Sequence, residues 1–267
     1  MNRKRMIRFF HLSIVVLIFL CAIAVLNFNA FVFPLTLFER HVGSWVSSML
    51  HPSQSPVGCN SQVAAHRGFA NINMYQDSSR TAIEAAIQSK VRAIEIDVNI
   101  VSNNIYLMHD NFTLEEINNP KLILLHHPQI LTLQEFLNLY SRSFDVIIVD
   151  IKEVNVAREA AFDLFKQLSF LDDKEKFNVI GLSCRLIRQI ERELNIKSGC
   201  ESQGVIANWA LGLSLWSTNF RTTNEFQVWI NKILKLKTII WTFDTASEAK
   251  DYCQYKPDIV LVDFVFR

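Results

Sequence analysis

Glycine is scarce in this sequence, which has seven glycines in 267 residues. The chain contains no G-x-G-x-x-G sequence, no Walker sequence and no internal repeat. This argues against a glycine-rich phosphate loop. Basic and acidic residues are nearly balanced, with a formal net charge of +1. Nothing in this balance suggests a general nucleic-acid surface. Half of the residues are hydrophobic and 20% are charged, as expected of a globular core with one membrane segment.

The five cysteines include no C-x-x-C pair, which argues against a zinc site. Cys21 lies within an apolar N-terminal segment and is expected to be embedded in a membrane. The other four, Cys59, Cys184, Cys200 and Cys253, are dispersed along the chain. If the domain is exported, one or two disulfides are expected, with Cys184 and Cys200 as the first candidate pair. Free buried thiols are the alternative.

Residues 1–38 have the pattern of a membrane anchor or a signal segment. Four basic residues near the start precede apolar runs over 12–26 and 30–35: Arg3, Lys4, Arg5 and Arg8. No A-x-A cleavage site follows, and the apolar length approaches the roughly 20 residues that cross a bilayer. We therefore favour an uncleaved single-pass anchor. Because basic residues remain on the cytoplasmic side, the rest of the chain is expected on the other side, periplasmic or extracellular/lumenal.

Residues 39–60 are predicted to form a juxtamembrane linker. Apolar residues at helical spacing would form one face of a helix: Val42, Trp45, Val46, Met49 and Leu50. This face is compatible with the lipid interface, with Trp45 as an anchor, and equally with a helix that caps the bottom of the domain. Pro52 and Pro56 indicate a hinge into the folded domain.

Residues 61–267 alternate between strand-like and helix-like patterns. Strands are predicted at 62–66, 92–98 with a short partner at 104–109, 145–151, 177–183, 198–204, 212–217, 238–242 and 258–263. Helices are predicted at 79–90, 132–140, 155–168, 185–195, 223–235 and 246–255. Three of the strands are continuous apolar runs, typical of parallel strands buried on both faces. The pattern predicts an α/β fold, a (β/α)₈ TIM barrel. An open doubly wound sheet is the runner-up, although it would more often have a glycine-rich first turn.

Polar residues stand at the predicted strand ends, where the active site of such a barrel lies. His66 and Arg67 end the first strand. Glu95 and Asp97 are two residues apart on the second strand, so both carboxylates face the same side. Two acids on an inward face are costly without a cation, and a divalent ion bound by carboxylate oxygens removes that cost. The alternative is that both acids lie on the outer face or at a solvated strand end.

The next two units repeat this arrangement. His109 and Asp110 end an apolar strand, and Asp150 and Lys152 end the Val-Ile-Ile-Val-Asp-Ile-Lys run. Singly, each of these is more often a structural histidine or a surface ion pair. Jointly, four successive units with polar groups at a strand end are hard to explain without a shared site.

These pieces resemble the glycerophosphodiester phosphodiesterases, a family of TIM-barrel hydrolases. The matching motifs are Ala65-His66-Arg67-Gly68, Ile94-Glu95-Ile96-Asp97-Val98, His109-Asp110, Leu131-Thr132-Leu133-Gln134-Glu135, Val149-Asp150-Ile151-Lys152 and Trp241-Thr242-Phe243-Asp244. The likeness spans roughly residues 63–264, nearly the whole domain. Any one motif is weak evidence, whereas the ordered series is fairly specific.

The resemblance implies metal-dependent hydrolysis of a glycerophosphodiester or lysophospholipid. Glu95, Asp97 and Asp150 would hold a divalent metal ion, Ca²⁺ or Mg²⁺. His66 and His109 would act as general base and general acid. Two cations, Arg67 and Lys152, would stabilise the charge of the transition state, and Trp241 would contact the substrate. The family's reaction passes through a cyclic phosphate that water then opens.

Three departures from the family's pattern indicate a divergent member. The family usually has Glu-Asn-Thr at the start of the first helix, where this chain has Ser79-Arg80-Thr81, although Ser79 is a good N-cap. Asp150 replaces a glutamate, and Asp244 stands where an asparagine is common. One alternative is therefore a catalytically inactive barrel that binds phospholipid head groups or acts as a scaffold. Another is a related enzyme that releases a different alcohol, such as a sphingomyelinase-D-like phosphodiesterase.

Overall fold

The computed structural model describes residues 39, 61–69, 76–201, 203–252 and 255–263. The predicted anchor at 1–38, and all of the predicted linker except Glu39, lie outside these residues. Within the described ranges, no helix combines the length and apolarity that a bilayer crossing requires.

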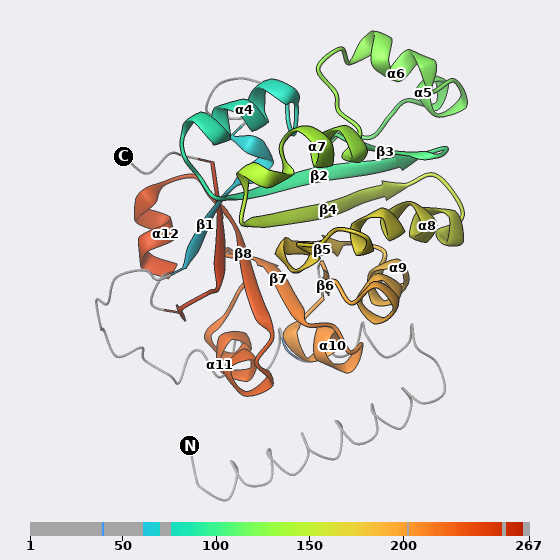
Figure 1. Cartoon of the computed structure of the whole chain (residues 1–267). Helices are drawn as coiled ribbons and strands as arrows, with labels where there is room; N and C mark the ends of the chain where they lie inside the picture. Colours follow the sequence, from blue (N-terminus) through green and yellow to red (C-terminus); the bar gives the residue numbers. More distant parts are fainter. Residues whose placement is uncertain (1–38, 40–60, 70–75, 202, 253–254, 264–267) are drawn as a thin grey trace, which may run out of the picture.

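The fold is a nearly closed barrel of eight parallel strands surrounded by helices (Figure 1). The barrel strands pair in the order β6-β5-β4-β2-β1-β9-β8-β7, and β3 pairs antiparallel with the end of β2. The strands are β1 (Gln62–Ala65), β2 (Ala93–Val101), β3 (Asn104–Leu107), β4 (Val146–Val154), β5 (Phe177–Gly181), β6 (Lys197–Cys200), β7 (Leu215–Asn219), β8 (Lys237–Phe243) and β9 (Ile259–Val262). All eight predicted strands and the short partner are confirmed, and the runner-up open sheet is excluded.

The barrel is closed between β6 and β7 by close packing, since the described residues show no backbone ladder there. A Cβ atom added at Gly199 on β6 would lie 2.9 Å from both the Cβ and the carbonyl oxygen of Leu215 on β7. Only glycine lets the two strands approach this closely.

Helices follow most of the strands and cover the outside of the barrel (Figure 1). They are α4 (Arg80–Gln88), α5 (Leu114–Asn118), α6 (Lys121–His126), α7 (Leu133–Leu139), α8 (Arg158–Ser169), α9 (Cys184–Gln189), α10 (Val205–Ala210), α11 (Glu225–Leu234) and α12 (Ala246–Tyr252). The six predicted helices are present, with α9 continued by a π-helical segment over Ile190–Leu194. The short helices α5, α6 and α10 were not predicted, because five or six residues carry too little periodicity to detect.

Strand alternation divides the core into two layers. Inward positions such as Ala93, Ile148 and Leu261 form the cluster inside the barrel. Outward positions such as Ile94 and Ile96 pack against the helices. By the same period of two, the next inward positions are Glu95 and Asp97 on β2 and Asp150 on β4.

Candidate active site

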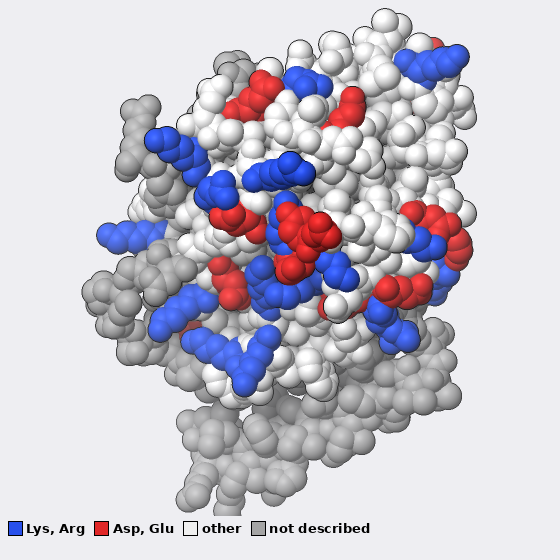
Figure 2. Space-filling model, viewed as in Figure 1, with Lys and Arg blue, Asp and Glu red and all other residues white. Residues whose placement is uncertain are grey.

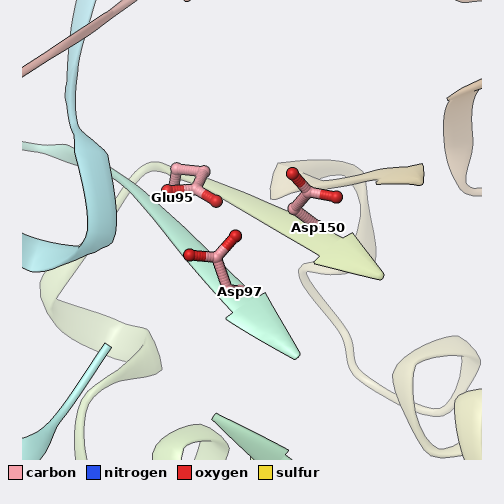
Figure 3. A group of neighbouring side chains, drawn as sticks. All are labelled: Glu95, Asp97 and Asp150. Atoms are coloured by element: carbon pink, nitrogen blue, oxygen red, sulfur yellow. The ribbon is translucent and has the colours of Figure 1, made fainter. Parts of the chain in front are cut away.

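Three acids on two adjacent strands converge at the barrel mouth (Figure 3). Asp97 on β2 and Asp150 on β4 are direct partners across the parallel ladder, and Glu95 lies two residues before Asp97. Ala93 and Ile148 are the preceding inward residues on these strands, so the acids continue the inward-facing rows. The sequence prediction that Glu95 and Asp97 share an inward face is therefore confirmed, and the outward alternative is wrong.

All three acids are buried, with exposed fractions of 1% for Glu95, 0% for Asp97 and 3% for Asp150. Burial raises the pKa of Glu95 well above its ordinary value, and the charges of Asp97 and Asp150 add to this effect. Burial likewise raises the pKa of Asp150, helped by the nearby Glu201 carboxylate. Each of these two acids resists ionisation unless positive charge lies close by.

Arg67 and Lys152 supply part of that positive charge. The Arg67 Nε lies 3.0 Å from one Asp97 oxygen, and the Lys152 Nζ lies 3.1 Å from the other and also pairs with Asp150. Burial lowers the pKa of both cations, but the surrounding carboxylates outweigh it and leave each pKa above its ordinary value. Both side chains are therefore held charged at neutral pH.

The carboxylate oxygens of the site fit a divalent metal ion. One oxygen from each of Glu95, Asp97 and Asp150 lies within 4.8 Å of the others. Both Asp97 oxygens make ion pairs but no hydrogen bond of good geometry, and one Asp150 oxygen is buried without a hydrogen bond in the described structure. Buried polar atoms are normally satisfied, and carboxylate oxygens are the ligands that Ca²⁺ and Mg²⁺ prefer.

A tight turn over His66–Gly68 carries His66 and Arg67 to this site. The Arg67 backbone N–H donates to the Glu95 carboxylate at 2.9 Å, and this hydrogen bond holds the turn next to the acids. Gly68 has a φ of +70°, and a Cβ atom there would lie 2.8 Å from the Ala82 backbone on α4. The glycine of the His-Arg-Gly motif is needed because the turn packs directly on this helix.

His66 is oriented by two groups from the last strands of the barrel. Its Nδ1 lies 2.7 Å from Asp263, just after β9, and its Nε2 lies 3.4 Å from the Thr242 hydroxyl on β8. A histidine held by a carboxylate on one nitrogen can exchange a proton through the other.

His109 stands two residues after β3, the antiparallel partner of β2. The preceding Met108 donates its backbone N–H to the Asp97 carbonyl at 3.0 Å, which places this segment beside the acids. The His109 Nδ1 lies 3.0 Å from Asp110, and about a third of the side chain (34%) is exposed. Within the described residues, His109 makes no hydrogen bond or ion pair with the three acids, and its predicted acid role stays a prediction.

Trp241 lies on β8, and its indole N–H donates to the Ser217 hydroxyl at 2.8 Å. Its predicted contact with substrate also stays a prediction. Asp244, one residue beyond β8, forms an exposed ion pair with Arg221 at 3.1 Å.

Ser79 takes the structural role expected of it. Its hydroxyl accepts the Ala82 backbone N–H at 3.4 Å and caps α4. Its neighbour Ser78 is buried and accepts the Asp97 backbone N–H at 3.0 Å. The start of α4 is therefore linked to the acidic site through serines, in the region where the family carries a glutamate.

Three acids near the site were not predicted from the sequence. Asp263 and Glu201 each directly follow a barrel strand, so the strand-end rule that selected Asp150 could also have found them. Glu201 is 8% exposed. Burial raises the pKa of Glu201, and the charge of Lys152 and a hydrogen bond with Asp150 offset part of that rise. Asp77 lies 2.6 Å from the Arg67 guanidinium but stands in a loop, where no pattern marks it.

Cys184 and Cys200 form a disulfide, with Cα atoms 5.1 Å apart. The bridge links α9 to the end of β6, next to Glu201. The first candidate pair from the sequence is therefore confirmed, and the free-thiol alternative is wrong for these two residues.

On the molecular face in Figure 2, basic and acidic side chains are interspersed, which agrees with the near-zero net charge.

Many solved structures with the same fold are glycerophosphodiester phosphodiesterases. The enzyme from Parabacteroides distasonis superposes with a TM-score of 0.66 at 16% identity, covering 78% of this chain and 95% of that one. The enzyme from Thermotoga maritima gives 0.62 at 18% identity, covering 78% and 97%. A phosphodiesterase from Oleispira antarctica, solved with the product sn-glycerol-3-phosphate, gives 0.64 at 18% identity, covering 76% and 93%.

The sequence matches no family model, and no curated protein matches it. The fold resemblance expected from the motifs is confirmed, with the low identity of a divergent chain.

Proposed function

We propose that this protein is a metal-dependent phosphodiesterase that hydrolyses a glycerophosphodiester or a lysophospholipid. The observation that carries the proposal is the buried group of Glu95, Asp97 and Asp150, whose ligand atoms lie within 4.8 Å of one another. The fold shared with glycerophosphodiester phosphodiesterases supports the same reaction class.

Glu95, Asp97 and Asp150 would hold the metal ion, Ca²⁺ or Mg²⁺. When bound, such an ion acts as a Lewis acid on the phosphodiester oxygens and offsets their charge. Asp150 has a shorter side chain than the family's glutamate, but its place opposite Asp97 keeps its carboxylate within the group.

Arg67 and Lys152 would stabilise the charge that develops on the phosphoryl oxygens. Both are charged, partly buried and paired with Asp97, so they need little reorganisation during the reaction. His66 would be the general base, with Asp263 holding Nδ1 so that Nε2 accepts the proton of the attacking hydroxyl. His109 would be the general acid that protonates the leaving alcohol.

The substrate assignment has two supports. The Oleispira antarctica phosphodiesterase was solved with sn-glycerol-3-phosphate, which is the product expected of a glycerophosphodiester. The predicted anchor would hold the site near a bilayer, which favours a lipid-derived substrate such as a lysophospholipid.

The proposed location is a single-pass membrane protein with its catalytic domain on the non-cytoplasmic side. The basic residues at the N-terminus support this orientation. The Cys184–Cys200 disulfide supports it independently, because such bonds persist mainly in oxidising compartments.

Product identification tests the reaction. Glycerophosphocholine incubated with the protein and calcium should yield glycerol phosphate, detected by phosphorus NMR, with a cyclic phosphate as a transient species. Release of phosphocholine instead would place the cleaved bond on the other side of the phosphorus and would contradict this substrate orientation.

A further inference from the structure

A cavity of about 600 Å³ lies near the amino ends of the barrel strands, where α11 packs on β7 and β8. Its walls come from the starts of β6, β8 and β9 and from the C-terminal end of α11. Parallel strands place their amino ends together, so this cavity is separated from the active site by the length of the barrel. The volume is within the range of small-molecule sites.

Five lysines line the cavity: Lys197, Lys232, Lys235, Lys237 and Lys256. None of them has a salt bridge to an acid within the described part of the chain. The lining includes one acid, Asp258, whose carboxylate accepts the Thr238 backbone N–H at 2.7 Å. The cavity therefore carries more positive charge than its one acid can neutralise.

The individual lysines differ in how they are held. Lys232 and Lys235 stand at the C-terminal end of α11, where the helix dipole also favours cations. The other three have no such explanation. Lys237 is half-buried and donates to the Asn178 side chain at 3.1 Å. Burial and the charge of Lys197 lower the pKa of Lys237, and the charge of Asp258 offsets part of this effect. Bringing these cations together has a cost, which a bound anion would remove.

One buried donor of the lining also lacks a partner. Trp216 is 1% exposed, and its indole N–H has no acceptor within the described structure. An indole N–H can only donate, so the missing partner of Trp216 must be an acceptor.

The chemistry of the lining identifies the ligand class. Lysine ammonium groups bind phosphate as point charges, and an N–H donor adds direction. Val228, Leu236 and Tyr255 form an apolar side of the same cavity, which suits an organic group attached to the phosphate. We infer that this cavity binds a small organic phosphate with two or more negative charges, either free in solution or as a lipid head group.

Calorimetric titration of the full chain with pyrophosphate, in EDTA at fixed ionic strength, tests the inference. The test variant is Lys197→Gln/Lys256→Gln, because both side chains are exposed and make no hydrogen bond or ion pair in the described structure. The matched control is Lys90→Gln/Lys121→Gln, which removes the same charge from exposed positions elsewhere. We expect one site, weakened at least about tenfold in the test variant and less than about twofold in the control.

A third variant, Trp216→Phe, keeps an aromatic ring in the core and removes the N–H together with the five-membered part of the indole. It should weaken pyrophosphate binding by about fivefold, the effect of one hydrogen bond. Equal affinity in all variants would mean that pyrophosphate binds elsewhere and would overturn the inference. The absence of binding both to pyrophosphate and to the lipid ligand described next would also overturn it.

The second arm distinguishes the source of the phosphate. The same proteins are titrated with a short-chain, water-soluble phosphatidylinositol phosphate, because the predicted anchor would carry the full chain onto vesicles of any composition. Binding of this lipid that is tighter than that of pyrophosphate and is lost in the test variant assigns a lipid head group. Loss confined to the pyrophosphate arm assigns a soluble ligand.

Discussion

Asp97 and Asp150 stand directly opposite each other on β2 and β4, with their carboxylates side by side in the barrel mouth. Two buried acids at this separation repel each other, and Lys152 and Arg67 offset only part of that repulsion. A bound divalent cation would offset the remaining repulsion between the two carboxylates.

Calcium or magnesium should stabilise the folded protein, and Asp97→Asn should remove this effect. A metal present at 100 times its dissociation constant adds about 2.7 kcal/mol to the free energy of unfolding. Thermal unfolding with and without metal measures the change. Glu115→Gln, an exposed acid on α5, is the matched control and should keep the full metal effect. An equal metal-induced rise in Asp97→Asn would place the ion elsewhere.

The carboxylate of Asp263 should contribute to turnover through His66. Asp263→Asn removes the charge beside Nδ1 while keeping the side-chain size, and we expect kcat to fall by about two orders of magnitude. The KM should change little, because Asp263 positions the histidine and does not contact the phosphate in this proposal. Steady-state kinetics on glycerophosphocholine measures both constants.

Asp244→Asn is the matched control for this experiment. It makes the same chemical change after the neighbouring strand, at an exposed residue paired with Arg221. Turnover within about threefold of the parent is expected there, since exposed ion pairs contribute little. Equal losses in the two variants would remove the special role of Asp263.

Glu39 should make the stability of the protein depend on pH. Its carboxylate is fully buried and accepts the backbone N–H groups of Val205 and Ile206, at the start of α10. Burial raises its pKa from 4.5 to about 7 despite these hydrogen bonds. The folded state therefore holds the proton more tightly than the unfolded state. The resulting stabilisation is complete below pH 4.5 and is lost as the pH rises through 7.

The size of this effect is about 3 kcal/mol between the two limits. Denaturant unfolding of the parent and Glu39→Gln across this pH range measures it, since the glutamine cannot ionise. The difference in unfolding free energy between the two proteins should change with pH, with the variant gaining relative to the parent at high pH. A constant difference from pH 4 to pH 8 would contradict the assignment.

The Cys184–Cys200 disulfide should stabilise the fifth and sixth units of the barrel. The bridge closes a loop with a sequence separation of 16, for which chain entropy predicts about 3 kcal/mol. Denaturant unfolding of Cys184→Ala/Cys200→Ala, compared with the oxidised parent, measures this contribution. Reduction of the parent should give the same loss, and a parent insensitive to reductant would contradict it.

Much of the barrel follows from sequence patterns, and the reasons are local. Continuous apolar runs such as Val146–Val149 mark buried parallel strands, and the period of two then fixes which acids face inward. Glu95, Asp97 and Asp150 are found together because strand position and register place them so. Asp263 and Glu201 obey the same rule and could have been included.

Other features depend on tertiary contacts that no local pattern encodes. Asp77 reaches Arg67 from a loop, and Glu39 reaches α10 across 166 residues of sequence. The basic cavity gathers the starts of three strands and the end of α11, and each lysine alone resembles a solvated surface residue. Such groupings follow from the closure of the barrel rather than from periodicity.

Hydrolysis of a panel of glycerophosphodiesters and lysophospholipids tests the proposed activity most directly. The assay compares added calcium or magnesium with EDTA, and His66→Ala is the blank. Turnover should require the metal, fall to the background in EDTA and be lost in His66→Ala. Folded protein that binds metal but turns over no member of the panel would contradict it, and the barrel would then be a binding module. In that case Ser79→Glu, which restores the family's glutamate, is the variant to assay next.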